Sequence, residues 1–183
     1  MAYCTVAQVR QYLGLTDAGD DPLISELIDR AGKAIDNHTR RVFESTADAT
    51  RSFTVGVDTI DRDLWLDEDL ASITTVTTNA DAATSTTISS SEYVTFPRNV
   101  TPYYKIRLLA SSSNDWTYTT DPEGGVTIAG AWAYSTSAPD DIVHACVRLA
   151  AYFYRQKDAG VFDVTAFPDA GVITVPEIGR AHV

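Results

Sequence analysis

The chain has 183 residues, of which 44% are hydrophobic, and it carries a formal net charge of −11 at pH 7. This length and apolar content exclude a disordered chain, because a domain of this size can bury its own core. The 25 acidic residues outnumber the 14 basic ones, which argues against a protein that grips nucleic acid through clustered lysine and arginine. No apolar run approaches the roughly 20 residues that span a bilayer, so we expect no membrane partner and a cytoplasmic product.

The first predicted helix covers residues 5–13. Thr5 and Gln8 have the spacing of a capping box, in which each side chain bonds a free backbone amide of the first turn. Apolar residues then recur at helical spacing until Gly14, a residue typical of a helix end. We therefore expect a short, capped helix at the start of the chain.

The second predicted helix covers residues 22–42, with Asp21 as its cap and Pro22 at its first position. Its apolar residues recur every three or four positions, so one stripe faces a core. His38 lies on that stripe. Because a single histidine on an apolar face is usually packed, we expect His38 to lie in the core and to bind no ligand.

From about residue 50 to about residue 135 the pattern changes to short runs rich in threonine, valine, isoleucine and aromatic residues. Turn signals such as DPEGG at 121–125 separate the runs. The runs are RSFTV, DLWL, SITTVTT, EYVTF, YYKIRLL, DWTYTT and GVTIAGAWAY. We predict an antiparallel β unit of about five to eight strands, inserted between the second helix and a third.

The third predicted helix covers residues 139–157 and contains a histidine and a cysteine two residues apart. At about 100° per residue, His144 and Cys146 point roughly 160° apart, which excludes a nucleophilic Cys–His pair. The predicted buried side holds Ile142, Ala145, Cys146, Leu149 and Phe153. The predicted exposed side holds His144, Arg148 and Arg155, and we hypothesise that this side contacts other subunits.

Cys4 and Cys146 are the two cysteines of the chain. Two cysteines so far apart in the sequence do not form a disulfide framework. In a reducing cytoplasm we expect two free, buried thiols that act as small apolar side chains.

The sequence carries no motif typical of a catalytic or cofactor site, such as GxSxG, HExxH or GxGxxG. The three histidines have no metal-type spacing. Six acids around the sequence LWL fit a divalent cation or, more typically, the solvated rim and turn of a strand. They are Asp58, Asp61, Asp63, Asp67, Glu68 and Asp69. We expect no catalytic residue, no cofactor and no metal.

Residues 161–183 follow the third helix, and their glycines and prolines exclude a further helix. The segment nevertheless keeps many apolar residues, including Phe162, Val164, Phe167, Val172, Ile173, Val175 and Ile178. We expect an extended arm that either packs back on its own domain or docks on a partner, by strand addition or in a groove.

The order of these elements and three sequence blocks within them resemble the head–tail connector family of tailed bacteriophages, also called adaptor or head-completion proteins. The blocks are AIDNHTRRVF at 34–43, LWLDEDLASIT at 64–74, and GAWAY at 130–134 with PDDIVHACVRLAAYFYRQ at 139–156. The resemblance covers about residues 3–160, and the chain departs from it at His38, where an aromatic residue is expected.

This resemblance implies a structural, non-enzymatic virion protein of the phage neck that is assembled in the host cytoplasm. Such proteins form a ring, expected to be dodecameric, beneath the portal, and they extend the DNA channel and help to retain the packaged genome. The implied partners are the portal protein, a stopper or tail-completion protein and other copies of the chain. Packaged DNA passes through the channel without specific binding. Because the C-terminal segment of the family commonly grips the portal, the apolar residues of the arm are candidate portal-docking residues.

The predicted fold class is α+β. N-terminal helices and a C-terminal helix pack together with an inserted antiparallel β unit, and an extended C-terminal arm follows. We expect one connector domain over residues 1–160 and the arm over residues 161–183.

Three alternatives remain open. The chain can be a β-rich carbohydrate- or protein-binding module that uses Trp65, Trp116 or Trp132 as stacking platforms, although tryptophans in strands more often pack in a core. It can be a stopper or tail terminator elsewhere in the phage neck. An enzyme would need two of the 25 acids to converge in a pocket, which a sequence does not show.

Overall fold

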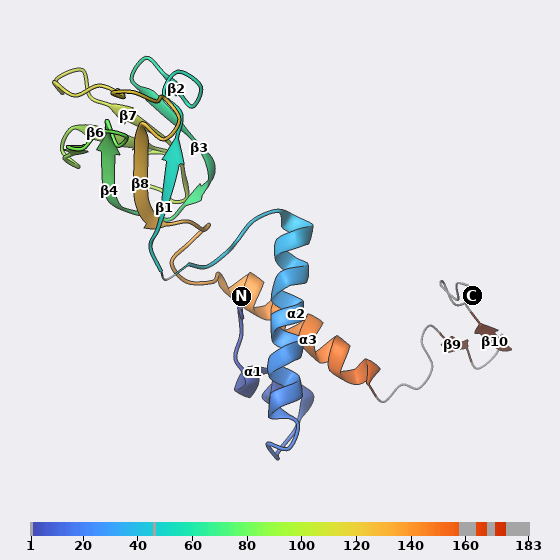
Figure 1. Cartoon of the computed structure of the whole chain (residues 1–183). Helices are drawn as coiled ribbons and strands as arrows, with labels where there is room; N and C mark the ends of the chain where they lie inside the picture. The colour runs from blue at the N-terminus through green and yellow to red at the C-terminus, as the bar shows by residue number, and fades with distance from the viewer. Residues whose placement is uncertain (1, 46, 158–163, 168–170, 175–183) are drawn as a thin grey trace.

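The structure, a computed structural model, describes residues 2–45, 47–157, 164–167 and 171–174. Within these residues, three helices pack together in one half of the molecule, and two four-stranded antiparallel sheets form the other half (Figure 1). The predicted α+β class is therefore confirmed. In the described part of the chain, no helix combines the length and the apolarity that crossing a bilayer requires.

Helix α1 (Val6–Leu13) begins and ends as predicted. The Gln8 amide donates a hydrogen bond to the Thr5 hydroxyl at 3.3 Å, and the Thr5 amide donates one to the Gln8 side chain at 2.8 Å. Gly14 ends the helix in the left-handed region with a φ of 74°, where any other residue would be strained. The capping box and the glycine stop are thus confirmed.

Helix α2 (Asp21–Thr39) differs from its prediction at both ends. Its cap is Asp20 rather than Asp21, and the Asp20 side chain makes no capping bond. It accepts hydrogen bonds instead from Tyr154 and from Lys157, at the end of helix α3 (Asp140–Gln156). At the other end, Arg40 enters the left-handed region with a φ of 55°, so the helix stops before residue 42.

His38 is exposed in the last turn of α2, so the prediction that it packs in the core is wrong. The buried residues of α2 all lie in its first two thirds and are Ile24, Leu27, Ile28, Ala31 and Gly32. The last turns extend past α3 towards the β unit (Figure 1), and after Gly32 no residue of α2 is fully buried.

Helix α3 buries a face that is turned by about one residue from the predicted one. Of the residues predicted to be buried, only Cys146 is fully buried. Ile142, Leu149 and Phe153 are half-buried, and Ala145 is exposed. The helix packs against both α1 and α2, so its buried face is shared between two neighbours. The buried residues are Cys146, Val147, Ala150, Ala151 and Tyr154.

The start of the chain completes the helical core. The buried Tyr3 hydroxyl donates a hydrogen bond to Asp36 and accepts one from the Phe43 amide at 3.0 Å. Cys4 and Cys146 are free and buried, as predicted. Their sulfur atoms lie 3.4 Å apart, a proximity that their separation in the sequence does not predict.

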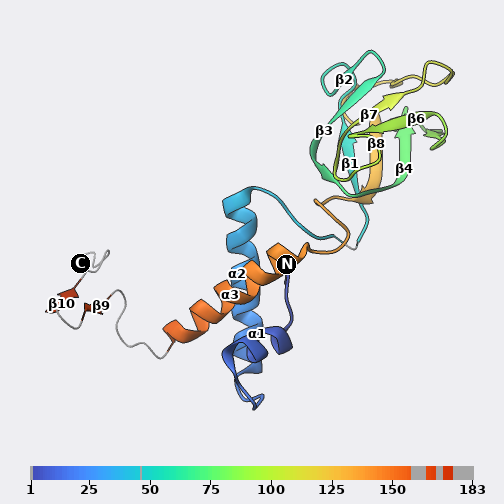
Figure 2. The same ribbon diagram turned by 180° about the vertical axis from the view of Figure 1, so that it is seen from behind.

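Eight strands form the β unit. They are β1 (Ala49–Phe53), β2 (Thr59–Ile60), β3 (Asp63–Leu70), β4 (Ser72–Thr78), β5 (Thr86–Ile88), β6 (Tyr93–Phe96), β7 (Tyr103–Leu108) and β8 (Val126–Ala131). The sheet orders are β1-β8-β4-β5 and β2-β3-β7-β6. The chain crosses between the sheets after β1, β3, β5 and β7, and the crossing from β3 to β4 takes a single residue, Ala71. Seen from behind, the sheets curve round a common interior (Figure 2). Side chains of both sheets fill it, including Leu64, Leu70, Val76, Ile106 and Ile128.

The predicted strand at 115–120 is wrong, because this run forms a loop that closes the β core. Trp116 is only 5% exposed and lies in the core. The loop amides bond side chains instead of a strand: Thr117 donates to the Thr78 hydroxyl at 2.9 Å, and Thr119 donates to Asp81 at 3.0 Å. The run therefore has the alternating sequence of a strand but forms a loop, because side chains hold its backbone amides.

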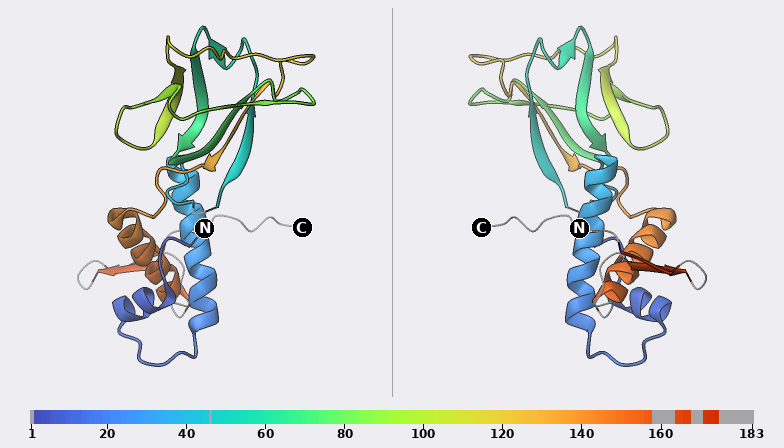
Figure 3. Two further views of the ribbon diagram at one scale, coloured as in Figure 1. Left: turned by 90° about the vertical axis from the view of Figure 1, so that its left-hand side faces the viewer. Right: turned by 90° about the vertical axis from the view of Figure 1, so that its right-hand side faces the viewer.

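Two connections join the helices to the β unit, and they contact each other. The Tyr134 amide donates a hydrogen bond to the Val42 carbonyl at 2.8 Å, and the Ser45 amide donates one to the Ser135 carbonyl at 3.2 Å. In the side views the β unit lies at one end of α2, and α1 and α3 lie on the opposite side of these two connections (Figure 3). The helices and the β unit each have a hydrophobic core of their own.

The described residues of the predicted arm form an antiparallel pair of strands, β9 (Val164–Phe167) and β10 (Gly171–Thr174). Among the candidate docking residues, Val164 and Phe167 belong to β9, while Val172 and Ile173 belong to β10. Phe162, Val175 and Ile178 lie outside the described residues. The described part of the arm is therefore extended and forms two strands that pair with each other, a pairing that we did not predict.

Candidate interaction surfaces

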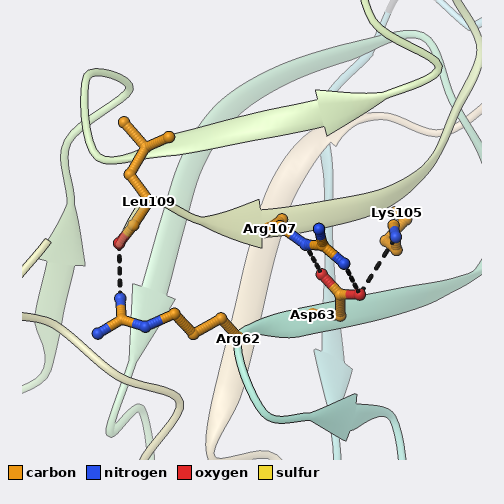
Figure 4. Close-up of polar contacts among 5 residues, drawn as sticks. All are labelled: Arg62, Asp63, Lys105, Arg107 and Leu109. Carbon is orange, nitrogen blue, oxygen red and sulfur yellow. Dashed lines mark hydrogen bonds and ion pairs between the residues drawn. The ribbon is translucent and has the colours of Figure 1, made fainter. Parts of the chain in front are cut away.

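A cluster of charged side chains lies on the outer face of the β2-β3-β7-β6 sheet (Figure 4). Strands β3 and β7 are antiparallel neighbours, with Asp63 opposite Arg107 and Trp65 opposite Lys105. Side chains two residues apart on a strand share a face, so this register brings all four together. Asp63 accepts hydrogen bonds from Lys105 Nζ at 3.1 Å and from Arg107 Nη2 at 2.6 Å.

The two cations fix the charge of Asp63. The hydrogen bond from Arg107, followed by that from Lys105, lowers the pKa of the Asp63 carboxyl to about 2. The same contact raises the pKa of the Arg107 guanidinium. At neutral pH Asp63 therefore carries no proton that it can give to a substrate, and the cluster suits recognition or stability rather than general acid catalysis.

We expect Asp63 to make stability depend on pH below about pH 4. Its folded pKa of about 2 lies below its ordinary value of 3.8, so its contribution is complete above about pH 4 and is lost as the pH falls to about 2. Because Arg107 is half-exposed, we expect a loss of about 1 kcal/mol. Urea unfolding at about pH 5 and about pH 2.5, followed by tryptophan fluorescence, measures it.

The matched variants are Asp63→Asn and Asp29→Asn, of which only the first removes a partner of Lys105 and Arg107. Asp29 is exposed on α2. Asp63→Asn should reduce the loss of stability between the two pH values by about 1 kcal/mol, while Asp29→Asn should leave it as in the wild type. Equal pH dependence in Asp63→Asn and wild-type protein would contradict the assignment.

Aromatic side chains surround Lys105. Its Nζ lies 4.8 Å from the centre of the Trp65 ring and 4.4 Å from that of Phe96, which is a cation–π distance. Trp65 also stacks on Tyr104, with ring centres 6.2 Å apart and planes 23° apart. Trp65 is 44% exposed and Tyr104 49% exposed, so this aromatic pair is open to solvent.

A recess of about 470 Å³ adjoins Trp65. Arg62 forms part of its wall and donates a hydrogen bond to the Leu109 carbonyl at 2.6 Å (Figure 4). Its apolar and charged lining residues include Ile60, Asp61, Arg62, Asp63, Trp65 and Arg107. The recess thus combines an exposed indole ring with fixed hydrogen-bonding groups.

The other two tryptophans named as stacking platforms are not at the surface. Trp116 and Trp132 are each 5% exposed, and the Trp132 indole donates a hydrogen bond to the Ala49 carbonyl at 2.9 Å. Both pack in the β core, although Trp116 lies in the loop at 115–120 and Trp132 directly follows β8. Only Trp65 of the three is available for stacking.

A second surface lies on α3. His144, Arg148 and Arg155 are all exposed, as the helical wheel predicts. Tyr152 lies among them in the sequence and is 57% exposed. The two arginines outnumber the one exposed acid of this face, Asp141, so the face is net basic in a chain whose net charge is −11.

The six acids around LWL do not gather at one point. Asp67 and Glu68 pair with Arg51, while Asp69 pairs with Arg41 at 3.3 Å. Asp58 accepts a hydrogen bond from the Thr54 amide at 2.7 Å. Within the described part of the chain, no three His, Cys, Asp or Glu side chains are arranged to hold a metal ion.

Sequence reasoning missed the roles of Tyr104, Lys105 and Arg107. The alternation in YYKIRLL places Lys105 and Arg107 on one face of a strand, and that pattern was the available signal. No protein-family model matches this sequence, and no curated protein matches it significantly.

Proposed function

We propose that this chain is a structural subunit of the neck of a tailed bacteriophage, a head–tail connector that assembles as a ring beneath the portal. The observation that carries this proposal is the exposed basic face of α3, formed by His144, Arg148 and Arg155 around the exposed Tyr152. The resemblance of the chain over residues 3–160 to connector proteins supports it.

A ring requires two different faces on each subunit, because its contacts are head-to-tail. Exposed arginines and an exposed tyrosine are side chains that protein interfaces favour. A basic face in a chain of net charge −11 attracts the acidic surface of another copy, which steers the two faces into one register. The α3 face is therefore our candidate for one side of the contact between subunits.

The remaining partners follow from this position in the virion. The portal protein lies above the ring, with the C-terminal arm as the candidate docking segment, and a stopper or tail-completion protein lies below. An acidic protein surface repels DNA, so packaged DNA can pass without the arrest that lysine and arginine would cause.

The direct test is an amber mutation of this gene in the phage or prophage that encodes it, followed by electron microscopy of the lysate. The proposal expects free tails beside tailless heads, many of them without DNA. Suppression of the amber codon should restore whole particles. Normal infectious particles from the unsuppressed mutant would overturn the proposal.

A second candidate function, glycan binding by the β unit, is favoured by the exposure of Trp65. Its ring stacks on Tyr104 beside a recess with fixed charged groups, and exposed indole rings suit the apolar faces of sugars.

We expect Trp65→Ala to weaken any sugar that binds this recess at least about tenfold, because a buried aromatic contact is commonly worth more than 1 kcal/mol. A glycan array identifies the sugar, and calorimetry measures its Kd with both variants. Tyr118→Ala is the matched control, since Tyr118 is a 47% exposed aromatic residue of the same unit that does not line the recess. An array without hits, or equal loss in both variants, would remove this candidate.

A further inference from the structure

Cys4 and Cys146 meet inside the helical core although 142 positions separate them. Their sulfur atoms lie 3.4 Å apart, which is direct contact between two thiols. Cys146 is fully buried in the middle of α3, while Cys4 is 8% exposed just before α1. The pair joins the start of the chain to the last helix of the core.

The backbone on both sides of Cys4 is held in place. Before it, the Tyr3 hydroxyl bonds Asp36 and the Phe43 amide. After it, Thr5 forms the capping box of α1 with Gln8. With its backbone held and its side chain packed in the helical core, Cys4 has little freedom to turn its sulfur away from Cys146.

We infer that Cys4 and Cys146 form an oxidisable pair, which a peroxide closes to an intramolecular disulfide that ties the start of the chain to α3. A disulfide has a sulfur–sulfur distance of about 2.0 Å, so closure needs an approach of about 1.4 Å and no change of fold. No third cysteine competes, because the chain has two. The inference does not depend on the proposed function.

The reaction balances with one peroxide. One thiol sulfur attacks the peroxide O–O bond and becomes a sulfenic acid, while the departing hydroxide takes the thiol proton and leaves as water. The second thiol attacks the sulfenic sulfur, so the S–S bond forms and the S–O bond breaks. The departing hydroxide takes the second thiol proton and leaves as water. Two thiols are oxidised and one peroxide is reduced to two waters.

The environment of the pair sets its rate. The Cys4 thiol donates to the Cys146 sulfur, which lowers the pKa of Cys146 and raises the pKa of Cys4. Cys4 has the small solvent contact that a peroxide needs, and Cys146 has none. Cys146 has the lowered pKa but no contact with solvent, whereas Cys4 has the contact but a raised pKa. We therefore expect the disulfide to form in minutes to hours rather than in seconds.

The test treats the full, reduced chain with hydrogen peroxide and follows intact mass with free thiols counted in denaturant. We expect a mass lower by about 2 Da, loss of both thiols and a linked peptide pair containing Cys4 and Cys146, all reversed by dithiothreitol. The helical transition followed by circular dichroism should shift up by about 5 °C or more, because the disulfide closes a long loop. Denatured chain serves as the control for the oxidant.

Cys4→Ser and Cys146→Ser should show no such loss of 2 Da, and circular dichroism verifies that each is folded. If a variant does not fold, the peptide map of the oxidised wild-type chain still shows whether Cys4 and Cys146 are linked. Three results would overturn the inference: no reaction under conditions that oxidise the denatured chain, oxygen addition without a link, or dimers linked between chains. An oxidised chain with an unchanged Tm would overturn the proposed bracing of α3.

Discussion

Replacing Gly130 by alanine is expected to lower the free energy of unfolding of the β unit by about 3 kcal/mol or more. Gly130 lies in β8, between β1 and β4 in the sheet order. A Cβ atom at this position would lie 2.1 Å from the Ser72 carbonyl oxygen and 3.1 Å from Leu70 Cδ1. The first contact involves backbone that is itself paired with β8, so it can move only by breaking the sheet.

The chain provides both a probe and a control for this prediction. All three tryptophans lie in the β unit, so fluorescence during urea unfolding reports on that unit. Gly19→Ala is the matched substitution, because a Cβ there meets only the Oδ1 of the exposed Asp17 side chain, at 3.3 Å, and no backbone atom. We expect Gly19→Ala to change stability by less than about 0.5 kcal/mol. Gly130→Ala with wild-type stability would show that β4 and β8 do not approach as closely as described.

The features that the sequence predicted best depend on neighbours in the chain. Thr5 with Gln8 and the glycine at 14 define a helix locally, and the structure has that helix. The end of α2 was missed because Arg40 adopts a left-handed conformation, which its residue type does not indicate. The run at 115–120 was misread because its amides bond side chains of Thr78 and Asp81, far back in the chain.

Of the two candidate surfaces, the one that depends on neighbours in the chain was likewise predicted, and the one that depends on distant contacts was not. The exposure of His144, Arg148 and Arg155 follows from the period of one helix, and it was predicted correctly. The contact of Asp63 with Lys105 and Arg107 depends on the register of β3 against β7. That register is set by packing of the β core rather than by any local signal, so it was not predicted.

Reversing the charge of the α3 face is expected to abolish assembly while leaving the subunit folded. The double variant Arg148→Glu, Arg155→Glu replaces two exposed cations by anions, so the face repels the acidic surface that it should attract. In complementation of the amber mutant we expect the yield of infectious phage to fall at least about 100-fold, because the repulsion acts at every contact of the ring. Electron microscopy should show tailless heads beside free tails.

Two further variants separate assembly from stability in this experiment. Arg155 lies in the last turn of α3, where a cation stabilises the helix end, so Arg155→Glu costs up to about 1 kcal/mol of stability by itself. The neutral pair Arg148→Gln, Arg155→Gln removes attraction without adding repulsion, and it should lose less phage yield than the reversal. Arg98→Glu is the control for charge alone, since Arg98 is exposed in a loop of the β unit.

The outcomes of these variants distinguish a contact face from a merely solvated one. If α3 forms the contact, yield should decrease from Arg98→Glu through the neutral pair to the reversed pair. Every variant should stay folded, with Tm lowered by no more than the few degrees that about 1 kcal/mol costs. If the reversed pair supports wild-type yield, the α3 face is solvated and the ring contact must use another surface. A low yield that follows a low Tm would instead assign these arginines to helix stability, because an unfolded subunit fails to assemble whatever its charge.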